Sequence, residues 1–101
     1  MLDKAEARNI ALENAEVVNR ELVPKNIILF GSYINGMPTE NSDIDIAVVF
    51  DGFDGNWLET ATLRSQLKRK VNLLIEPHIL DESEDVTGFL NHVRQTGEVL
   101  I

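Results

Sequence analysis

Two segments of the sequence decide the fold, IILFGS at residues 27–32 and DIDIAVVF at residues 43–50. In the first segment, an apolar run ends abruptly at a Gly-Ser pair. In the second, two aspartates alternate with isoleucines before a further apolar run. Ten residues separate Ser32 from Asp43. Because β-branched apolar runs of this length are typical of strands, the chain places small residues, a hydroxyl and paired carboxylates at strand ends.

The strand predicted over residues 44–50 has two different faces. Side chains alternate along a strand, so both aspartates lie on one face of this strand. The opposite face is continuously apolar and requires a covering helix. The earlier run at 27–30 is apolar without alternation, which predicts a strand covered on both faces. Turn signals at 35–38 indicate that the connection between the strands is mostly loop. The residues that share the aspartate face are Asp43, Asp45, Ala47 and Val49.

Helices and a third strand are expected around these two strands. Residues 4–22 predict an amphipathic helix that starts at an Asp3–Glu6 capping box and stops at Pro24. A second helix is predicted at 57–69, and a third strand at 71–76, ended by Pro77.

The C-terminal part predicts a last helix and an apolar tail. A D-x-x-E cap at 81–84 precedes a helical pattern that ends at Gly97. The tail at 99–101 either adds a short edge strand or packs on a partner. The order α-β-β-α-β-α predicts a single α/β (α+β) domain over residues 1–101, a small mixed sheet backed by helices.

Composition excludes several classes of function. Nine basic against seventeen acidic side chains give a net charge of −8, which disfavours binding to long nucleic acid. No apolar run reaches the roughly 18 residues of a membrane span, and the N-terminus lacks the apolar core of a signal peptide. Cysteine is absent, which excludes disulfides and thiolate metal sites. We therefore expect a cytoplasmic protein that binds a basic partner or divalent cations.

The residues at the two strand ends suit phosphate and metal chemistry. Gly31 permits close approach of a phosphate to the backbone, and Ser32 can cap the following turn. Asp43 and Asp45 have Cα atoms roughly 6.6 Å apart if they lie on one strand face. Such hard oxygen ligands suit Mg²⁺ that is shared with substrate phosphates. Taken alone, the Gly-Ser pair is also typical of an ordinary turn that ends a strand. The two aspartates alone are also typical of the solvent-facing start of a strand.

Taken together, the Gly-Ser pair, the ten-residue spacing and the D-x-D element resemble the signature of nucleotidyltransferases of the DNA polymerase β superfamily. The short chain is similar to the minimal nucleotidyltransferase proteins in particular. The resemblance implies a polymerase β-like fold and the metal-dependent transfer of a nucleoside monophosphate, from ATP or another nucleoside triphosphate, to a hydroxyl. It implies that Gly31 and Ser32 bind the triphosphate, and that Asp43 and Asp45 are catalytic Mg²⁺ ligands.

The same resemblance implies a protein partner. Minimal nucleotidyltransferases often pair with a HEPN-domain toxin, and some act as antitoxins by attaching AMP to a tyrosine of that toxin. We therefore expect a HEPN-domain partner, with self-association into a homo-oligomer left open.

The chain departs from the family pattern at the third carboxylate. The matching position on the predicted third strand is Asn72, whose amide cannot act as a base. Glu76 is a weak substitute, because four strand residues displace it by roughly 13 Å.

A second departure is Asn35, which stands where relatives commonly have a basic residue. A cation for the phosphates must then come from elsewhere, although a solvated helix end is the simpler interpretation of each candidate. We interpret His78 as a loop histidine, with an approach to the nucleotide or a partner as the alternative. We interpret Trp57 as a packing residue, with base stacking as the alternative. The candidate cations are Arg64, Lys68, Arg69 and Lys70.

Two functions remain as hypotheses. The first is an active enzyme that transfers AMP to its partner, which rests on the intact Gly-Ser and D-x-D elements. The second is a catalytically weak binding module that neutralises its partner by association, which rests on Asn72, the acidic surface and the apolar tail. A small-molecule transferase is disfavoured, because the chain lacks a second domain to enclose a substrate.

Overall fold

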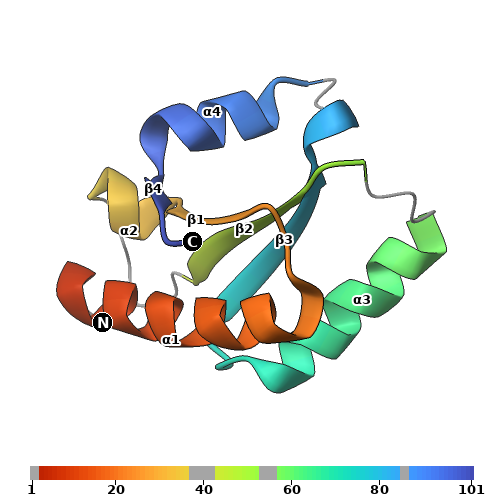
Figure 1. Ribbon diagram of the computed structural model, residues 1–101. Helices are drawn as coiled ribbons and strands as arrows, with labels where there is room; N and C mark the ends of the chain where they lie inside the picture. The colour runs from red at the N-terminus through yellow and green to blue at the C-terminus, as the bar shows by residue number, and fades with distance from the viewer. Residues whose placement is uncertain (1–2, 37–42, 53–56, 85–86) are drawn as a thin grey trace.

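The computed structural model describes residues 3–36, 43–52, 57–84 and 87–101. It contains a four-stranded sheet with helices on both faces (Figure 1). Among these residues, no helix combines the length and apolar character of a membrane span. The elements in chain order are α1 (Lys4–Leu22), β1 (Asn26–Phe30), α2 (Ser32–Asn35), β2 (Ile44–Phe50), α3 (Trp57–Lys70), β3 (Ile75–Asp81), the 3₁₀ helix η1 (Glu82–Glu84), α4 (Phe89–Thr96) and β4 (Glu98–Val99).

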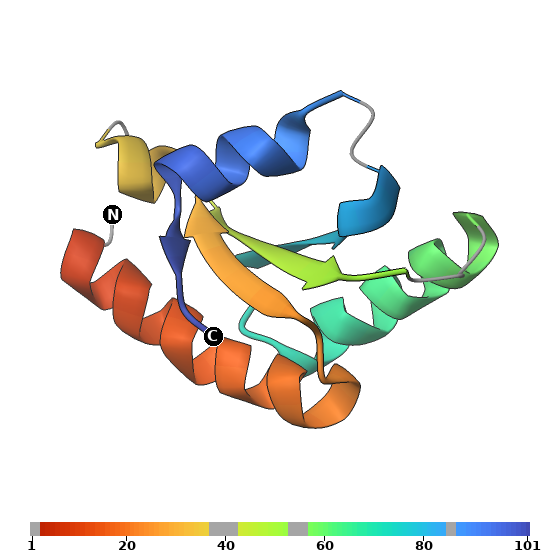
Figure 2. The same cartoon turned by 45° about the horizontal axis from the view of Figure 1, so that its top comes forward.

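The sheet is mixed, with the strand order β3-β2-β1-β4. β1 runs antiparallel to both β2 and β4, whereas β2 and β3 are parallel. Figure 2 shows β4 beside β1 at one edge of the sheet, with the C-terminus close to α1. The predicted fold class, a small mixed sheet backed by helices, is confirmed.

The two faces of the sheet are covered by different helices. α1 and α3 lie on one face and α4 lies on the other (Figure 1). The apolar face predicted for β2 packs against α1 and α3, while Ala47 and Val49 pack with Leu90 and Val93 of α4. β1 is therefore covered on both sides, as its sequence predicts.

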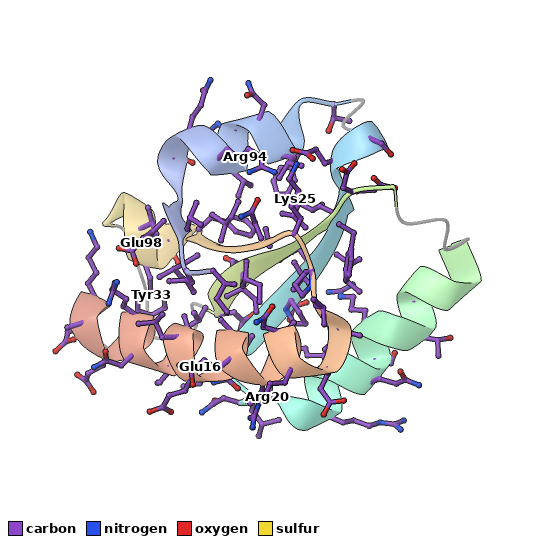
Figure 3. The ribbon with its side chains drawn as sticks, in the orientation of Figure 1. Glu16, Arg20, Lys25, Tyr33, Arg94 and Glu98 are labelled. Atoms are coloured by element: carbon purple, nitrogen blue, oxygen red, sulfur yellow. The ribbon has the colours of Figure 1, made fainter. Side chains whose placement is uncertain are left out.

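The first helix confirms its predicted bounds and its capping box. The backbone N–H of Glu6 donates to Asp3 Oδ1 at 2.7 Å, and that of Asp3 donates to Glu6 Oε1 at 3.5 Å. Glu16 and Arg20 point away from the sheet (Figure 3). The inward face carries small side chains, which let α1 pack closely against the strands. The residues of this face that are fully buried are Ala7, Ala11, Ala15 and Val18.

The third strand is the main error of the sequence-based prediction. β3 runs from Ile75 to Asp81, so residues 71–74 precede it and Pro77 lies inside it. Proline lacks an N–H donor and is therefore tolerated in an edge strand, and among the described strands β3 pairs only with β2. The assumption that Pro77 ends the strand was wrong because it ignored this exception.

The C-terminal part differs from the prediction at one point. The D-x-x-E motif caps the short η1 rather than a long helix, with Asp81 Oδ1 accepting from the Ser83 N–H at 2.9 Å. α4 begins after Gly88 and ends before Gly97, where the sequence predicts its stop. β4 pairs with β1 as an edge strand, which confirms that alternative for the tail.

Candidate functional site

The Gly-Ser pair lies where β1 ends and α2 begins. Gly31 has a φ of +87°, a backbone conformation that L side chains rarely adopt. A Cβ at this position would lie 2.4 Å from Asp45 Oδ2 on the neighbouring strand. Glycine is therefore required both by the backbone and by the carboxylate beside it.

Ser32 is the first residue of α2 and not its cap. The N-cap position is Gly31, and no side-chain hydrogen bond caps this helix, so the predicted capping role of Ser32 is wrong. α2 is a single turn, closed by the Ile34 N–H donating to the Gly31 carbonyl at 3.0 Å. Tyr33, only 4% exposed, anchors this turn in the core beside α1 (Figure 3). Ser32 is thus placed at the end of β1 by a turn that Tyr33 fixes to the core.

The two aspartates lie at the start of β2, on the face that the sequence predicts. Asp43 directly precedes the strand and is exposed, and Asp45 is half-buried. In the part of the chain that the structure describes, Asp43 has no hydrogen-bond or ionic partner. Two carboxylates two residues apart on one strand have Cα atoms roughly 6.6 Å apart.

Asp45 has a strand neighbour on each side. It is in register with Phe30 of β1 and with Glu76 of β3. Its Oδ1 lies 3.1 Å from Nε2 of His78, a residue of the same sheet face. The His78 ring also meets the Phe30 ring edge-on, with 5.1 Å between centroids. We call Gly31, Asp43, Asp45, Glu76 and His78 the carboxylate corner.

Glu76 lies beside Asp45 but turns toward α3. Its Oε2 is 2.7 Å from Lys68 Nζ, and its Oε1 pairs with the Arg64 guanidinium. The hydrogen bond from Lys68, with help from Arg64, lowers the pKa of Glu76 below its ordinary value. Glu76 is therefore a charged carboxylate at neutral pH.

Asn72 is not on the sheet, which corrects its predicted placement. It lies in the turn before β3, where its N–H donates to the Asn14 side chain at 2.8 Å. Its own Oδ1 accepts from the Leu74 N–H at 2.8 Å. The estimate of 13 Å for Glu76 was wrong because it counted from Asn72 as a strand residue. The register of β3 puts Glu76 opposite Asp45 instead.

The structure describes the side chains of some of the remaining predicted residues. Arg64 and Lys68 bind Glu76, and Arg69 is exposed on α3. The side chains of Asn35, Trp57 and Lys70 lie outside the described part. His78 was predicted to be a loop residue, and the structure places it in β3 beside Asp45. The signal that was missed is the pair Ile75 and Ile79 on either side of an edge-strand proline.

The carboxylates of the corner fit a hard divalent cation by their chemistry, because Mg²⁺ prefers oxygen ligands. Within the described ranges, however, no three acidic, histidine or cysteine side chains stand ready around one point. The reason is visible at Glu76, which faces Arg64 and Lys68. A three-carboxylate site requires this side chain to rotate toward Asp45.

Sequence comparisons match this chain to nucleotidyltransferases. A family model described as Polymerase beta, Nucleotidyltransferase matches residues 13–101. Two proteins of Methanocaldococcus jannaschii, both provisionally named protein adenylyltransferases, are similar to this chain. One is 38% identical over 78 residues, which cover 75% of this chain and 77% of the relative. The other is 43% identical over 47 residues, 46% of this chain, and the match spans only 47% of that relative's length.

Solved structures share the fold. A provisionally named nucleotidyltransferase from Sulfolobus solfataricus has a TM-score of 0.71 at 23% identity, covering 95% of this chain and 80% of its own. A toxin–antitoxin structure with AMP-PNP has a TM-score of 0.65 at 28% identity, covering 89% and 72%. A mutant MntA–HepT toxin–antitoxin structure, with two aspartates two positions apart replaced by glutamate, has a TM-score of 0.63 at 26% identity, with the same coverage.

Proposed function

Because the chain belongs to the polymerase β nucleotidyltransferase family, we propose that it transfers AMP from ATP to a hydroxyl group of a partner protein. The observation that carries this proposal is the adjacency of Gly31 at the end of β1, Asp45 in β2 and Glu76 at the register position beside Asp45 in β3. The names of the two M. jannaschii relatives support a protein acceptor. The similar structure with AMP-PNP supports an adenine nucleotide.

In this proposal, the corner binds the nucleotide through two elements. Gly31 and Ser32 hold the triphosphate at the turn where β1 ends, while the missing Cβ of Gly31 leaves the space that Asp45 Oδ2 occupies. Asp43 and Asp45 are the ligands of Mg²⁺, and a pair of aspartates with the same spacing was altered in the MntA–HepT mutant. When bound, Mg²⁺ would supply positive charge beside the triphosphate oxygens.

We assign the third carboxylate to Glu76 rather than to Asn72. The acceptor oxygen forms a bond to the α-phosphorus, the bond from this phosphorus to the oxygen that bridges to the β-phosphate breaks, and pyrophosphate leaves. The acceptor hydroxyl must lose its proton, and a nearby carboxylate can receive it. Glu76 suits this task because a glutamate carboxylate is unprotonated at neutral pH even without its cationic partners. Rotation away from Arg64 and Lys68 would bring it to the reacting atoms.

The test of this function is the intact mass of a HEPN-type partner after incubation with the protein, ATP and Mg²⁺. We expect the wild type to add the mass of one AMP group, and Asp43→Ala/Asp45→Ala to add none. An equal adduct with the double variant, or none with the wild type, contradicts the proposal.

Two further variants separate the candidates for the third carboxylate. Glu76→Gln should lower the rate of transfer by about 100-fold or more, the range of a positioned proton acceptor. Asn72→Asp should leave the rate unchanged, because Asn72 is not on the sheet. A rate increase in Asn72→Asp would return the role to that position.

The proposed acceptor is a tyrosine hydroxyl of a HEPN-domain toxin, and the protein would then act as a cytoplasmic antitoxin. The family resemblance and the MntA–HepT neighbours support this partner. Peptide mapping of the modified partner would locate the AMP group, and replacement of the mapped tyrosine by phenylalanine should abolish the adduct. Retention of the adduct on a serine or threonine would correct the acceptor without affecting the reaction type.

A second candidate function, a binding module without turnover, is favoured by one observation. Glu76 is engaged by two cations, so the corner is not assembled for chemistry. In this case, neutralisation of the partner relies on association, and Asp43→Ala should leave complex formation and neutralisation intact. Size-exclusion chromatography of the complex, together with a growth assay of the toxin, would measure both.

A further inference from the structure

The two oxygens of the Asp45 carboxylate have different neighbours. Oδ1 lies 3.1 Å from His78 Nε2, on the β3 side. Oδ2 lies on the β1 side, where a Cβ on Gly31 would come within 2.4 Å of it. The plane of the carboxylate is therefore oriented across β2, with one oxygen toward the histidine and the other toward the Gly-Ser turn.

The position of His78 follows from its strand neighbours. Its register partner on β2 is Ala47, whose methyl group leaves room above the strand. The imidazole meets the Phe30 ring at an interplanar angle of 62°. Phe30 is held in turn by Phe89 of α4, with ring centroids 5.7 Å apart. The ring therefore rests on an aromatic support that extends to the helix above the sheet.

Close packing alone does not force His78 onto Asp45. On another side, the histidine borders a hollow of about 220 Å³, whose described lining also includes Arg64, Ile79 and Leu80. The histidine side chain is 33% exposed. Because free space is available beside the ring, the contact with Asp45 reflects the hydrogen bond and the Phe30 edge.

We propose that His78 is a positioning residue for Asp45: its Nε2–H donates to Oδ1 and keeps Oδ2 on the Gly31 side of the strand, as a ligand for a divalent cation. The inference rests on the proposed function, since that function makes Asp45 a cation ligand. Hydrogen bonds to ligating carboxylates orient them, and loss of such outer partners typically weakens metal binding by 10- to 100-fold. The contact requires the tautomer or charge state that places hydrogen on Nε2.

The experiment titrates the protein with Mn²⁺ alone and follows free Mn²⁺ by electron paramagnetic resonance. His78→Phe retains a ring against Phe30 but cannot donate, and it should weaken Mn²⁺ binding by about 10-fold. His78→Gln can donate through its amide and should recover most of the lost affinity. His92→Phe, at the exposed histidine of α4, is the matched control and should bind as the wild type does. Circular dichroism melting verifies that each variant folds.

The outcomes separate this inference from the proposed function. If the wild type binds no Mn²⁺, or Asp45→Asn binds as well as the wild type, the metal site itself is wrong. If Asp45→Asn abolishes binding but His78→Phe binds as tightly as the wild type, only the positioning role is overturned. A His78→Gln variant as weak as His78→Phe would also overturn it, because the ring and not the donated hydrogen bond would then be required.

Discussion

At one end of the sheet, Lys25 and Arg94 both pair with Glu82, at 2.5 and 3.0 Å (Figure 3). Arg94 also donates to the Asn26 side chain at 3.2 Å, which ties α4 to the start of β1. We call these four residues the ionic clasp. At the other end, the carboxylate corner gathers three acidic residues, and the described side-chain hydrogen bond of Asp45 is the one with His78.

The two ends of the sheet contribute differently: the clasp to stability and the corner to binding. In the clasp, each charge has a partner of opposite sign, and the group joins β1, η1 and α4. In the corner, Asp43 and Asp45 repel each other on one strand face, which is unfavourable without a cation. Sites that bind charge commonly retain such unfavourable arrangements. Variants of the corner should therefore change binding, and variants of the clasp should change stability.

The largest effect is expected for Gly31→Ala, which alters the backbone and the carboxylate together. The positive φ should cost about 1–3 kcal/mol of stability. The new methyl group would also displace Asp45 Oδ2, from which it would lie 2.4 Å away. We expect both a lower thermal midpoint and loss of Mn²⁺ binding.

Gly36→Ala is a matched control for this variant. Gly36 has a similar φ of +79°, but a Cβ there meets no atom within 4 Å. Its variant should lose stability and keep Mn²⁺ affinity. Equal Mn²⁺ affinities of the two variants would show that Gly31 does not act through Asp45.

Asp43→Asn tests the corner without altering the backbone. It should weaken Mn²⁺ binding by about 10-fold or more, since a charged oxygen ligand becomes a neutral one. Its thermal midpoint should stay the same or rise, because one of two neighbouring like charges is removed. Asp51→Asn removes the same charge just after the other end of β2 and should not change Mn²⁺ binding. A marked loss of stability in Asp43→Asn would break the contrast between corner and clasp.

Asn14→Ala tests the turn that separates Asn72 from the sheet. Asn14 is buried, and its side chain joins the Ile10 carbonyl to the Asn72 N–H at 2.7 and 2.8 Å. Loss of these hydrogen bonds should cost about 1–3 kcal/mol. Urea unfolding would measure this loss, with the exposed Asn9→Ala on the same helix as the control. Mn²⁺ affinity should stay unchanged, and a loss would mean that the turn supports the corner directly.

Much of the fold could be predicted because local patterns decide it. The capping box fixes the start of α1, and the alternation of residues 44–50 fixes both faces of β2. The predicted bounds of the third strand were wrong because proline ends a strand in most contexts. The edge position of β3 removes this restriction for Pro77.

For the site, the Gly-Ser turn and the two aspartates were predictable from their spacing along the chain. The contact of His78 with Asp45 was not, because it depends on the register of β3 against β2. Nor could the sequence identify the partners of Glu76, since α3 approaches β3 through tertiary packing. The unpredicted part of the site is therefore its β3 side, where pairing and not spacing places the residues.

Glu82→Gln tests the clasp. Lys25, through its hydrogen bond and charge, and Arg94 hold the pKa of Glu82 below its ordinary value. A carboxylate with a lowered pKa in the folded state stabilises the protein above its unfolded pKa, and this contribution is lost as the pH falls through the lowered value. Glu82→Gln should thus melt at a slightly lower temperature than the wild type at pH 7. The difference should shrink as the pH falls through the lowered pKa of Glu82, because the wild-type carboxyl then becomes protonated.

Glu16→Gln, on the outward face of α1, is the control for this titration and should show little difference at either pH (Figure 3). Mn²⁺ binding by Glu82→Gln should equal that of the wild type. A melting difference that persists at low pH would mean that the clasp does not act through the Glu82 charge.

The smallest effect is expected for Lys68→Met. This variant tests whether the Glu76 carboxylate is held in an ion pair, as Glu82 is in the clasp. Lys68 donates to Glu76 and also to the Ile75 carbonyl, at 3.0 Å. Because its hydrogen bond is the main cause of the lowered pKa of Glu76, the variant should raise that pKa toward the ordinary value. Carboxyl ¹³C chemical shifts during a pH titration would measure the change, with Arg69→Met as the control. An unchanged pKa would show that Lys68 does not hold Glu76 in solution, so that only the ion pair with Arg64 would have to break before Glu76 joins Asp45.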